Sequence, residues 1–184
     1  MDSGQHAEPR RSGAFRTILS LLVMVAFVFG LSWALRTFVF QPYEIPSGSM
    51  ENTIMTGDMV FSEKISYYLR DPEPGDIVTF QDPEIPGRVL IKRCIAVGGQ
   101  TVDINDEDGL VYVDGVALSE PYTHGLPSDP FAITLADLTY PYTVPEGEIW
   151  VMGDNRTNSK DSRYFGSVKE KSVTGKACFI YWPL

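Results

Sequence analysis

The chain has 184 residues and a formal net charge of −9, enough for one domain of ordinary size with an appendage. Residues 1–36 hold four arginines against two carboxylates, a net charge of +2, so the remaining residues carry −11. Such an acidic domain excludes nucleic acid as a partner, because phosphate binding needs clustered positive charge, and anionic lipid headgroups would repel it.

A membrane-length apolar segment lies near the N-terminus. Thr17 to Leu35 contains no charged residue, and as a helix these 19 residues would be about 28 Å long, close to the hydrocarbon thickness of a bilayer. We expect a disordered cytoplasmic tail at 1–14, a transmembrane anchor at 15–37 and an extracytoplasmic domain at 38–184. The cytoplasmic N-terminus follows from three arginines before the helix and only one close after it.

A cleaved signal peptide is the alternative for this segment, since Ser32-Trp33-Ala34 loosely matches a small-x-small cleavage site. The apolar stretch is longer than a typical signal-peptide core, and no polar or helix-breaking residue precedes that site. We therefore expect an uncleaved single-pass anchor in the cell membrane, with the lipid bilayer as a partner.

The rest of the chain alternates short β-like segments with Gly, Pro and Asp, which is typical of a mostly β domain. The expected strands are Met59–Phe61, Asp76–Phe80, Val89–Val97, Thr101–Ile104, Leu110–Val113, Ile149–Met152 and Gly175–Trp182. Asp114-Gly115 predicts a tight hairpin turn. Short helices are expected at Met50–Met55, at Ile65–Leu69 and within Phe131–Leu138, and a surface excursion at 119–142.

Two cysteines, Cys94 and Cys178, lie in the exported part, where a disulfide is permitted. Each lies in an apolar, strand-like segment, so we expect two buried free thiols, with a bridge as the alternative. Neither cysteine has the neighbours of a zinc site. Asp103–Gly109 has the alternating oxygens of a calcium loop, but its glycine comes one residue late and the closing glutamate is missing. We therefore predict no metal and no organic cofactor.

Lys92 gives the first indication of function, because it lies inside the apolar segment Val89–Val97. Burial disfavours the charged form of a lysine, and a neutral lysine beside a serine hydroxyl is a general base that makes the serine a nucleophile. Ser49 offers such a hydroxyl in the turn Pro46-Ser47-Gly48-Ser49-Met50, where free backbone N–H groups could stabilise an oxyanion. The alternatives are a lysine that reaches solvent or a carboxylate, and a turn that is only a flexible hinge.

Histidine does not fit the role of the base. His6 lies before the membrane segment, and His124 lies in an irregular loop with no apolar framework to hold it. A third element, Gly153–Gly166, is densely polar and follows the apolar segment Ile149–Met152. Its hydroxyls could bind an uncharged lysine, and its Asp and Arg side chains could brace a site.

At these segments the chain resembles the bacterial type I signal peptidases, membrane-anchored Ser/Lys endopeptidases that remove signal peptides from exported proteins. The matching segments are Pro46–Met50 with Gly57-Asp58, Gly75–Phe80, Lys92-Arg93 with Gly98, and Gly153–Gly166. The resemblance implies a mostly β fold, with a single N-terminal transmembrane helix followed by a compact, β-rich, signal-peptidase-like catalytic domain. It also implies preprotein signal peptides as partners, and the protein-export channel is a further expected partner.

The resemblance implies roles for individual residues. Ser49 would be the nucleophile and Lys92 the general base, with Ser47 and the backbone N–H of Ser49 as the oxyanion hole. The supporting residues would be Ser159, which would orient Lys92, and the ion pairs of Asp154 with Arg93 and of Asp161 with Arg163. The family usually has Pro-Thr-Leu where this chain has Asn52-Thr53-Ile54. We expect the missing proline to cost up to about 1 kcal/mol through unfolded-state entropy.

A substrate peptide would bind in extended form along a strand edge, with alternate side chains in pockets. The residues expected to line shallow pockets for small side chains are Tyr43, Ile45, Met50, Ile54 and Ile91. The resemblance implies the same preference, with alanine-like residues at the first and third positions before the cut. Plain core packing is the alternative role for these residues.

The sequence thus predicts a membrane-bound serine endopeptidase that cleaves signal peptides after small-x-small sites with a Ser49/Lys92 dyad. Two alternatives stay open. One is a specialised Ser/Lys protease for pilus or conjugation proteins, or a self-cleaving regulator. The other is a non-catalytic, membrane-tethered scaffold that has kept a peptidase fold, for which Asn52 is the only support in the sequence.

Overall fold

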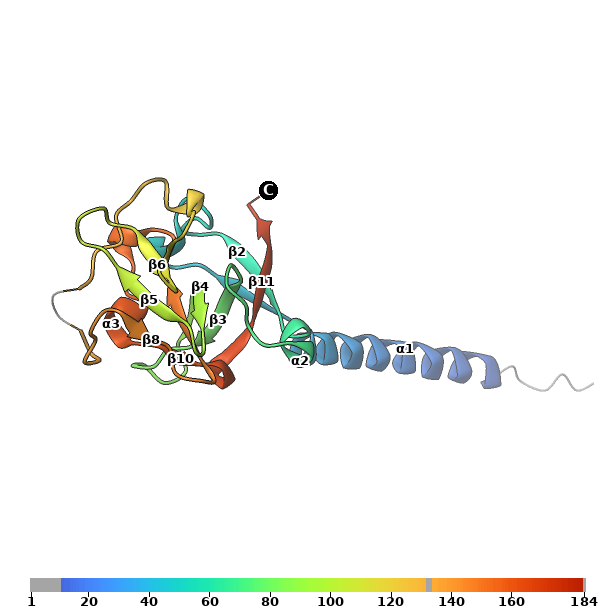
Figure 1. Ribbon diagram of the computed structural model, residues 1–184. Coiled ribbons are helices and arrows are strands. Elements are labelled where there is room, and N and C mark those ends of the chain that lie inside the picture. Colours follow the sequence, from blue (N-terminus) through green and yellow to red (C-terminus); the bar gives the residue numbers. More distant parts are fainter. Residues whose placement is uncertain (1–10, 132–133, 184) are drawn as a thin grey trace, which may run out of the picture. The chain divides into compact units, whose positions relative to one another are not determined.

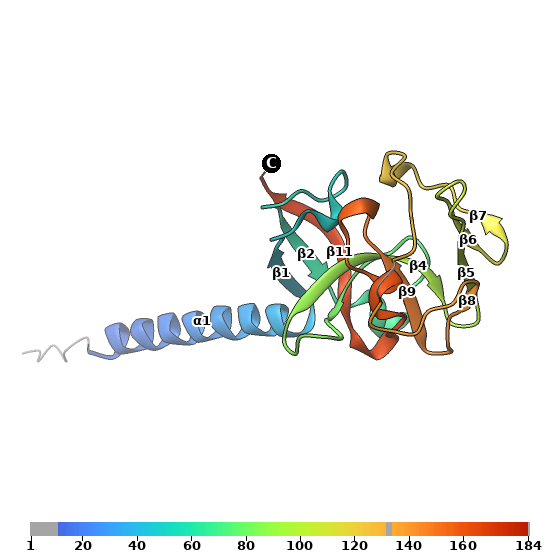
Figure 2. The ribbon, with the colours of Figure 1, turned by 90° about the vertical axis from the view of Figure 1, so that its left-hand side faces the viewer.

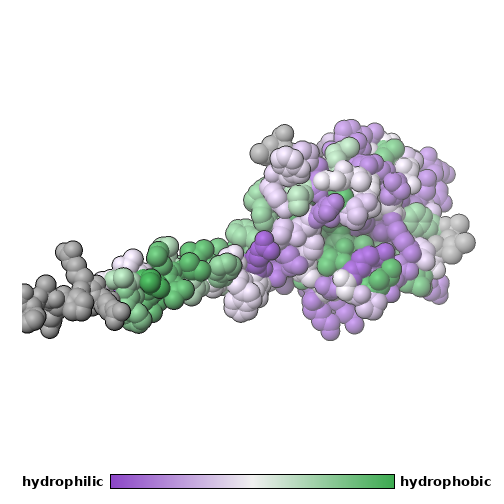
Figure 3. All heavy atoms as spheres, turned by 180° about the vertical axis from the view of Figure 1, so that it is seen from behind, coloured by the Kyte–Doolittle hydropathy of each residue, from purple (hydrophilic) through white to green (hydrophobic). Residues whose placement is uncertain are grey.

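The computed structural model describes residues 11–131 and 134–183, and the chain divides into two units, Met1–Val39 and Phe40–Leu184. The first unit contains helix α1 (Arg11–Phe38; Figure 1). Its segment Gly13–Phe38 is long and apolar enough to cross a membrane, with a mean hydropathy of 2.5. Figure 3 shows the apolar side chains along this helix and a largely hydrophilic visible face of the second unit. The helix includes residues 11–14, which were expected in the tail, and the rest of that tail lies outside the described residues.

The second unit is built on two antiparallel sheets. The larger sheet has the strand order β1 (Phe40–Glu44), β2 (Met59–Glu63), β11 (Val173–Trp182), β3 (Ile77–Gln81), β4 (Val89–Val97), β9 (Glu148–Met152) and β10 (Val168–Lys169). The smaller sheet has the order β7 (Val116–Ala117), β6 (Val111–Val113), β5 (Thr101–Ile104) and β8 (Tyr142–Thr143). Figure 2 shows β1, β2 and β11 together at one end of the larger sheet. The mostly β fold is therefore as the sequence predicts.

The predicted strands are all present, with ends shifted by a few residues or fewer, and the Asp-Gly turn is confirmed. Asp114 and Gly115 both have positive φ angles, 52° and 77°, and they connect β6 to β7. Strand β7 is the second strand of the predicted hairpin, whereas β1, β8 and β10 were not predicted. Strand β1 contains Pro42, which argues against a strand except at a sheet edge, where a missing N–H costs little. The sheet order places β1 at such an edge.

The short helices were predicted less well. The helices are α2 (Ser66–Leu69), α3 (Ser162–Phe165) and the 3₁₀ turns η1 (Gly48–Met50), η2 (Pro121–Thr123), η3 (Arg156–Asn158) and η4 (Glu170–Ser172). The expected helix at Met50–Met55 is wrong, because η1 ends at Met50 and Asn52 has a φ of 79°. A proline cannot adopt that angle, so the entropic cost expected for its absence does not apply to this backbone. Residues 131 and 134–138 are not helical either.

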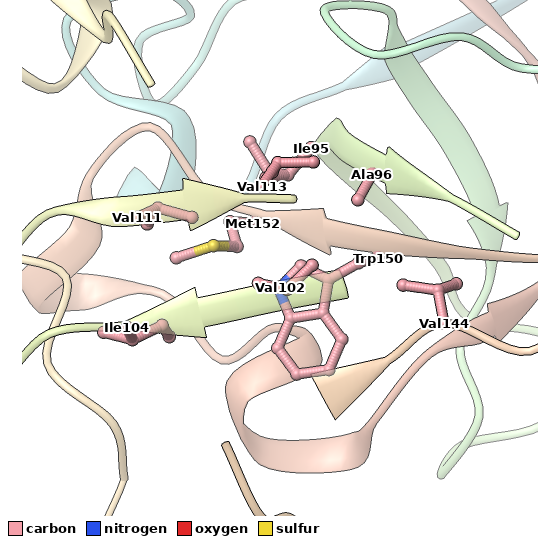
Figure 4. Close-up of a cluster of buried hydrophobic side chains, with 9 residues drawn as sticks. All are labelled: Ile95, Ala96, Val102, Ile104, Val111, Val113, Val144, Trp150 and Met152. Carbon is pink, nitrogen blue, oxygen red and sulfur yellow. The ribbon is translucent and has the colours of Figure 1, made fainter. Parts of the chain in front are cut away.

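The core between the two sheets is apolar. Figure 4 shows nine buried side chains, and those of Trp150 and Met152 from β9 lie near the valines of β5 and β6. Tyr140 and Tyr142 pack their rings against Trp150, at centroid distances of 6.0 and 4.9 Å. Strand β9 belongs to the larger sheet, and its buried side chains pack against the smaller sheet. The polar residues 153–166 begin directly after this strand.

Both cysteines are free thiols. Cys94 is buried, and burial raises the pKa of its thiol to about 12. Cys178 is exposed, so the expectation that both thiols would be buried is wrong for this residue. The apolar segment around Cys178 belongs to β11, whose C-terminal half is largely exposed.

Candidate active site

Ser49 and Lys92 lie in contact although 43 residues separate them in the chain. The Nζ atom of Lys92 lies 2.6 Å from the Oγ atom of Ser49, and it also donates a hydrogen bond of 2.8 Å to the carbonyl oxygen of Ile91. Lys92 is 3% exposed and Ser49 is 7% exposed. The contact is therefore a short polar one inside an otherwise buried environment.

Burial lowers the pKa of Lys92 to about 8, although the carboxylates of Asp161, Asp154 and Asp82 oppose this shift. Among the residues that the structure describes, none forms an ion pair with Lys92 within 4.0 Å. The lysine thus feels negative charge only at longer range. The amine can lose its proton near neutral pH, as a general base must.

The pairing of β4 explains how Lys92 reaches the site. Residues 89–93 pair with β3, whereas pairing with β9 begins only at Arg93, opposite Met152. The stretch 89–92 therefore has one edge that no described strand occupies. Side chains alternate along a strand, so Leu90 and Lys92 face the same way and Ile91 faces the other.

The Ser49 turn (residues 46–54) packs on an apolar cluster. Met50, Ile45, Ile54 and Val60 are all buried and pack together. The 3₁₀ turn Gly48–Met50 thus anchors Met50 in this cluster. The hydroxyl of the preceding residue, Ser49, is then left facing Lys92.

A pocket of about 420 Å³ contains both side chains. Its lining includes Ser47, Ser49, Lys92, Ser159, Leu90 and Phe165. Sequence reasoning missed three charged residues that also line it, Glu84, Arg88 and Lys160, and Lys160 pairs with Glu84 at 2.8 Å. Two of them lie in the connection that immediately precedes the strand of Lys92, which was the signal available in the sequence.

Two buried ion pairs brace the polar segment (residues 153–166). Arg93 donates two hydrogen bonds to Asp154, of 2.8 and 2.7 Å. Arg163 donates to Asp161 at 2.9 and 3.0 Å. Burial by itself would raise the pKa of Asp161, but Arg163 and the backbone N–H of Gly153 hold it below its usual range. Both pairs that the resemblance implied are present in the structure.

Ser159 does not make the hydrogen bond expected of it. Its buried hydroxyl oxygen makes no hydrogen bond of good geometry within the described residues, although it lies close enough to the Asp161 carboxylate to help lower the pKa of that group. Lys92 is already bonded to Ser49 and Ile91. The two side chains share one pocket. A role of Ser159 in orienting Lys92 therefore stays a prediction, and this geometry does not contain the bond on which it would depend.

Gly153 permits the close approach of the Ser49 turn and the polar segment. A Cβ atom at this position would collide with the Ser159 side chain and with the carbonyl oxygen of Ser49. The Ser49 turn and the polar segment can therefore touch only because residue 153 has no side chain.

The expected surface excursion (119–142) turns out to pack on the polar segment in its first part, which corrects that prediction. Arg156 is 1% exposed and donates to both carboxylate oxygens of Glu120, at 2.9 and 2.6 Å. The ring of Tyr122 lies 4.0 Å from the guanidinium of Arg93. The sequence showed Arg156 as part of a polar cluster, but it contained no signal for its partner Glu120, 36 residues away.

The residues expected to line the substrate pockets lie elsewhere. Ile45, Met50 and Ile54 are buried core residues, Tyr43 is half-buried, and none of these lines the pocket that contains Ser49. Ile91 packs against the same cluster. A separate apolar pocket of about 140 Å³ is lined by Ile54 together with residues of β2 and β11. Their role in substrate selection remains a prediction.

Several known proteins are similar to this chain in sequence. A family model described as signal peptidase, peptidase S26, matches residues 15–182. Probable signal peptidase I-1 of Synechocystis sp. is 41% identical, and the match covers 88% of this chain and 80% of that protein. Signal peptidase I of Mycobacterium tuberculosis is 35% identical, and the match covers 91% of this chain and 73% of that protein.

A crystal structure of a signal peptidase I from Enterococcus faecalis is similar with a TM-score of 0.47 and 39% identity, over 58% of this chain and 97% of that one. The family match extends over nearly the whole chain and includes the Ser49 turn, Lys92 and the polar segment. The chain therefore belongs to the signal peptidase family, peptidase S26.

Proposed function

We propose that this protein is a membrane-anchored serine endopeptidase that removes signal peptides from preproteins with Ser49 as nucleophile and Lys92 as general base. The observation that carries the proposal is the 2.6 Å contact between the Lys92 amine and the Ser49 hydroxyl in a buried site. The family supports the reaction class, and the relatives named above are signal peptidases.

In the first step the uncharged amine of Lys92 takes the proton of the Ser49 hydroxyl as its oxygen attacks the scissile carbonyl carbon. The resulting oxyanion is stabilised by the backbone N–H of Ser49 and by the hydroxyl of Ser47, which lines the same pocket. The ammonium of Lys92 then gives its proton to the leaving amine, and the carbon–nitrogen bond breaks. An ester between Ser49 and the signal peptide remains.

In the second step Lys92 activates a water molecule that hydrolyses this ester. The carbonyl oxygen of Ile91 accepts a hydrogen bond from the Lys92 amine, so the amine stays in place while its proton comes and goes. The buried pairs of Asp154 and Asp161 brace the segment around the pocket without neutralising Lys92 by direct contact.

The substrate would bind along the unpaired edge of residues 89–92, which lies beside Lys92. Small residues at the first and third positions before the cut would enter pockets near Ile54 and Ile91. A helix long and apolar enough to cross a membrane supports an anchor, and the arginines before it support a cytoplasmic N-terminus. Confinement to the bilayer would raise the effective concentration of membrane-inserted preproteins, and the protein-export channel would deliver them.

The test is cleavage of a purified preprotein with an Ala-x-Ala site by the detergent-solubilised full chain. Wild type should cut at that site, whereas Ser49→Ala and Lys92→Ala should not. Ser119→Ala and Lys171→Ala change an exposed serine and an exposed lysine away from the pocket, and they should cleave normally. If the folded wild type cuts none of several preproteins, the specialised protease or the scaffold replaces the proposed function. Full cleavage by either site variant would disprove the dyad.

A further inference from the structure

One side chain of the polar segment reaches the peptide unit that precedes Ser49. The Nδ2 atom of Asn155 donates a hydrogen bond of 3.0 Å to the carbonyl oxygen of Gly48, across 107 positions of sequence. The backbone N–H of Asn155 donates to the carbonyl oxygen of Ser49 at 3.2 Å. Asn155 thus binds the carbonyl groups on both sides of the Ser49 Cα atom, that of Gly48 with its side chain and that of Ser49 with its backbone.

The surroundings fix the direction of the Asn155 amide. Its Nδ2 atom faces two acceptors, the carbonyl of Gly48 and the Glu51 carboxylate at 3.3 Å. Its Oδ1 atom accepts from the hydroxyl of Thr157 at 3.4 Å. Asn155 precedes the turn η3, yet its side chain makes no capping bond to that turn. An asparagine at this position commonly caps its own helix, and here it reaches across to the Ser49 turn.

The geometry of a peptide bond gives this contact a consequence. The C=O of Gly48 and the N–H of Ser49 belong to one planar trans unit, so they point in opposite directions. A donor that holds the Gly48 carbonyl toward the polar segment therefore directs the Ser49 N–H away from it. Hydrogen bonding to the carbonyl also polarises the unit and strengthens its N–H as a donor. The N–H of Glu51 donates to the same carbonyl at 3.2 Å and supports the orientation.

We propose that Asn155 is a positioning residue that aims the backbone N–H of Ser49 at the oxyanion of the transition state. The inference rests on the proposed function, because it takes Ser49 as the nucleophile. Asn155 itself touches neither the substrate nor the Ser49 hydroxyl in this role. Its effect should appear when the tetrahedral intermediate forms and not when the substrate binds.

The experiment measures kcat and KM for Asn155→Ala on a preprotein with an Ala-x-Ala site. We expect kcat to fall about 10- to 100-fold, less than the loss of an oxyanion donor itself, with KM within twofold of wild type. The backbone bond from residue 155 to Ser49 is kept in this variant, so only the side-chain contact is removed. Asn105→Ala, in the turn after β5, is the matched control and should behave as wild type.

A transition-state readout separates positioning from general support of the fold. A peptide aldehyde forms a tetrahedral adduct with the catalytic serine, so its affinity should fall by about the same factor as kcat/KM. Binding of an uncleaved substrate peptide to Ser49→Ala and to Ser49→Ala/Asn155→Ala should be the same. Should Asn155→Ala unfold at the assay temperature, Asn155→Ser is judged by the same criteria.

Asn155→Asp distinguishes loss of the donor from new repulsion, because the added carboxylate would face that of Glu51. The double variant Asn155→Asp/Glu51→Gln removes the repulsion without restoring a donor at residue 155, so we expect it to stay impaired. Recovery of wild-type kcat in the double variant would overturn the proposal. So would an unchanged kcat in Asn155→Ala, or a loss confined to KM, while wild type still depends on Ser49. Inactive wild type would instead refute the proposed function.

Discussion

Strand β9 and the polar segment that follows it are stabilised in different ways. Trp150 and Met152 enter an apolar cluster between the sheets, whereas the residues after Gly153 enter a buried network of ion pairs. The apolar cluster does not need exact orientations of its side chains, since the hydrophobic effect is non-directional. The polar network depends on direction, because each buried charge needs its own partner. Stability and catalysis are therefore supported by neighbouring but chemically separate parts of the domain.

The largest effect that we expect is the loss of activity without loss of the fold in Lys92→Met. Methionine fills a similar volume and removes a buried amine, so the free energy of unfolding should stay equal or rise. Turnover should fall by at least about 10⁴-fold, as when the base of other serine proteases is removed. Lys92→Arg should lose turnover as well, since arginine does not give up its proton. Thermal unfolding and preprotein cleavage measure the two effects, and residual turnover above a hundredth of wild type in either variant would contradict them.

A substitution in the apolar cluster should instead lower the stability and leave the activity largely unchanged. Trp150→Ala removes a fully buried ring and should lower the free energy of unfolding by about 3–5 kcal/mol. Below its unfolding transition, the variant should keep much of its kcat, because the buried apolar cluster that contains the ring includes none of the named site residues. Denaturant unfolding and cleavage at low temperature test this. Trp150→Phe is the matched control and should lose less stability. A kcat that falls in proportion in both variants would mean that the two regions are not separable.

The pair of Glu120 and Arg156 tests the polar network directly. Removal of one partner, as in Glu120→Leu, leaves a buried charge alone and should cost about 3–5 kcal/mol. The double variant Glu120→Leu/Arg156→Leu removes both charges and should regain much of that stability. Denaturant unfolding of both variants gives the comparison. A double variant less stable than the single one would show that the pair is worth more than the apolar replacement.

The pH dependence of cleavage and of stability should show a smaller effect of Lys92 on both properties. Because the pKa of Lys92 is lowered to about 8, the active neutral amine is the minor form at pH 7 and the major form at pH 9. We expect kcat/KM to rise roughly tenfold per unit at low pH and to level off above about 8. The pKa of Lys92 is about 8 in the folded state and 10.5 for a free lysine side chain, so the unfolded state binds more protons between these values. The free energy of unfolding should therefore increase as the pH rises from 8 to 10.5. A flat profile from pH 6 to 9 would refute Lys92 as the base.

The smallest expected effect concerns the backbone of the Ser49 turn. Asn52 has a φ of 79°, so Asn52→Gly should change the free energy of unfolding by less than about 1 kcal/mol. Asn52→Pro, the residue usual in the family, should destabilise the turn, because proline holds φ near −65°. Thermal unfolding distinguishes the two variants. Greater stability of Asn52→Pro would show that the turn can change to the conformation that proline requires.

Features that depend on local pattern could be predicted from the sequence. The nine-residue strand β4 was predicted with its correct ends, and its lysine pointed to the candidate site, because a lysine in an otherwise largely apolar strand is expected to be buried. The Asp-Gly hairpin followed from the positive φ that such turns need. The short edge strands β8 and β10 contain two residues each, too few to show any alternation.

Features that depend on distant partners could not be predicted. The pairing of Arg156 with Glu120 and the bond from Asn155 to Gly48 join residues 36 and 107 positions apart. Nothing in the residues near Asn155 indicates that its amide leaves its own turn. The exposure of Cys178 likewise depends on how β11 lies at its C-terminal half, and not on its apolar neighbours.

The register of β4 decides which of two adjacent cations lies against Ser49. Lys92 faces Ser49, while Arg93, one position further, faces Asp154 and the ring of Tyr122. Lys92 can become neutral by losing a proton, whereas Arg93 stays positively charged. A deletion of one residue from the hairpin before β4 that shifted the strand by one place would bring Arg93 to the position of Lys92. The enzyme would then have a guanidinium at its serine and no means of deprotonating it.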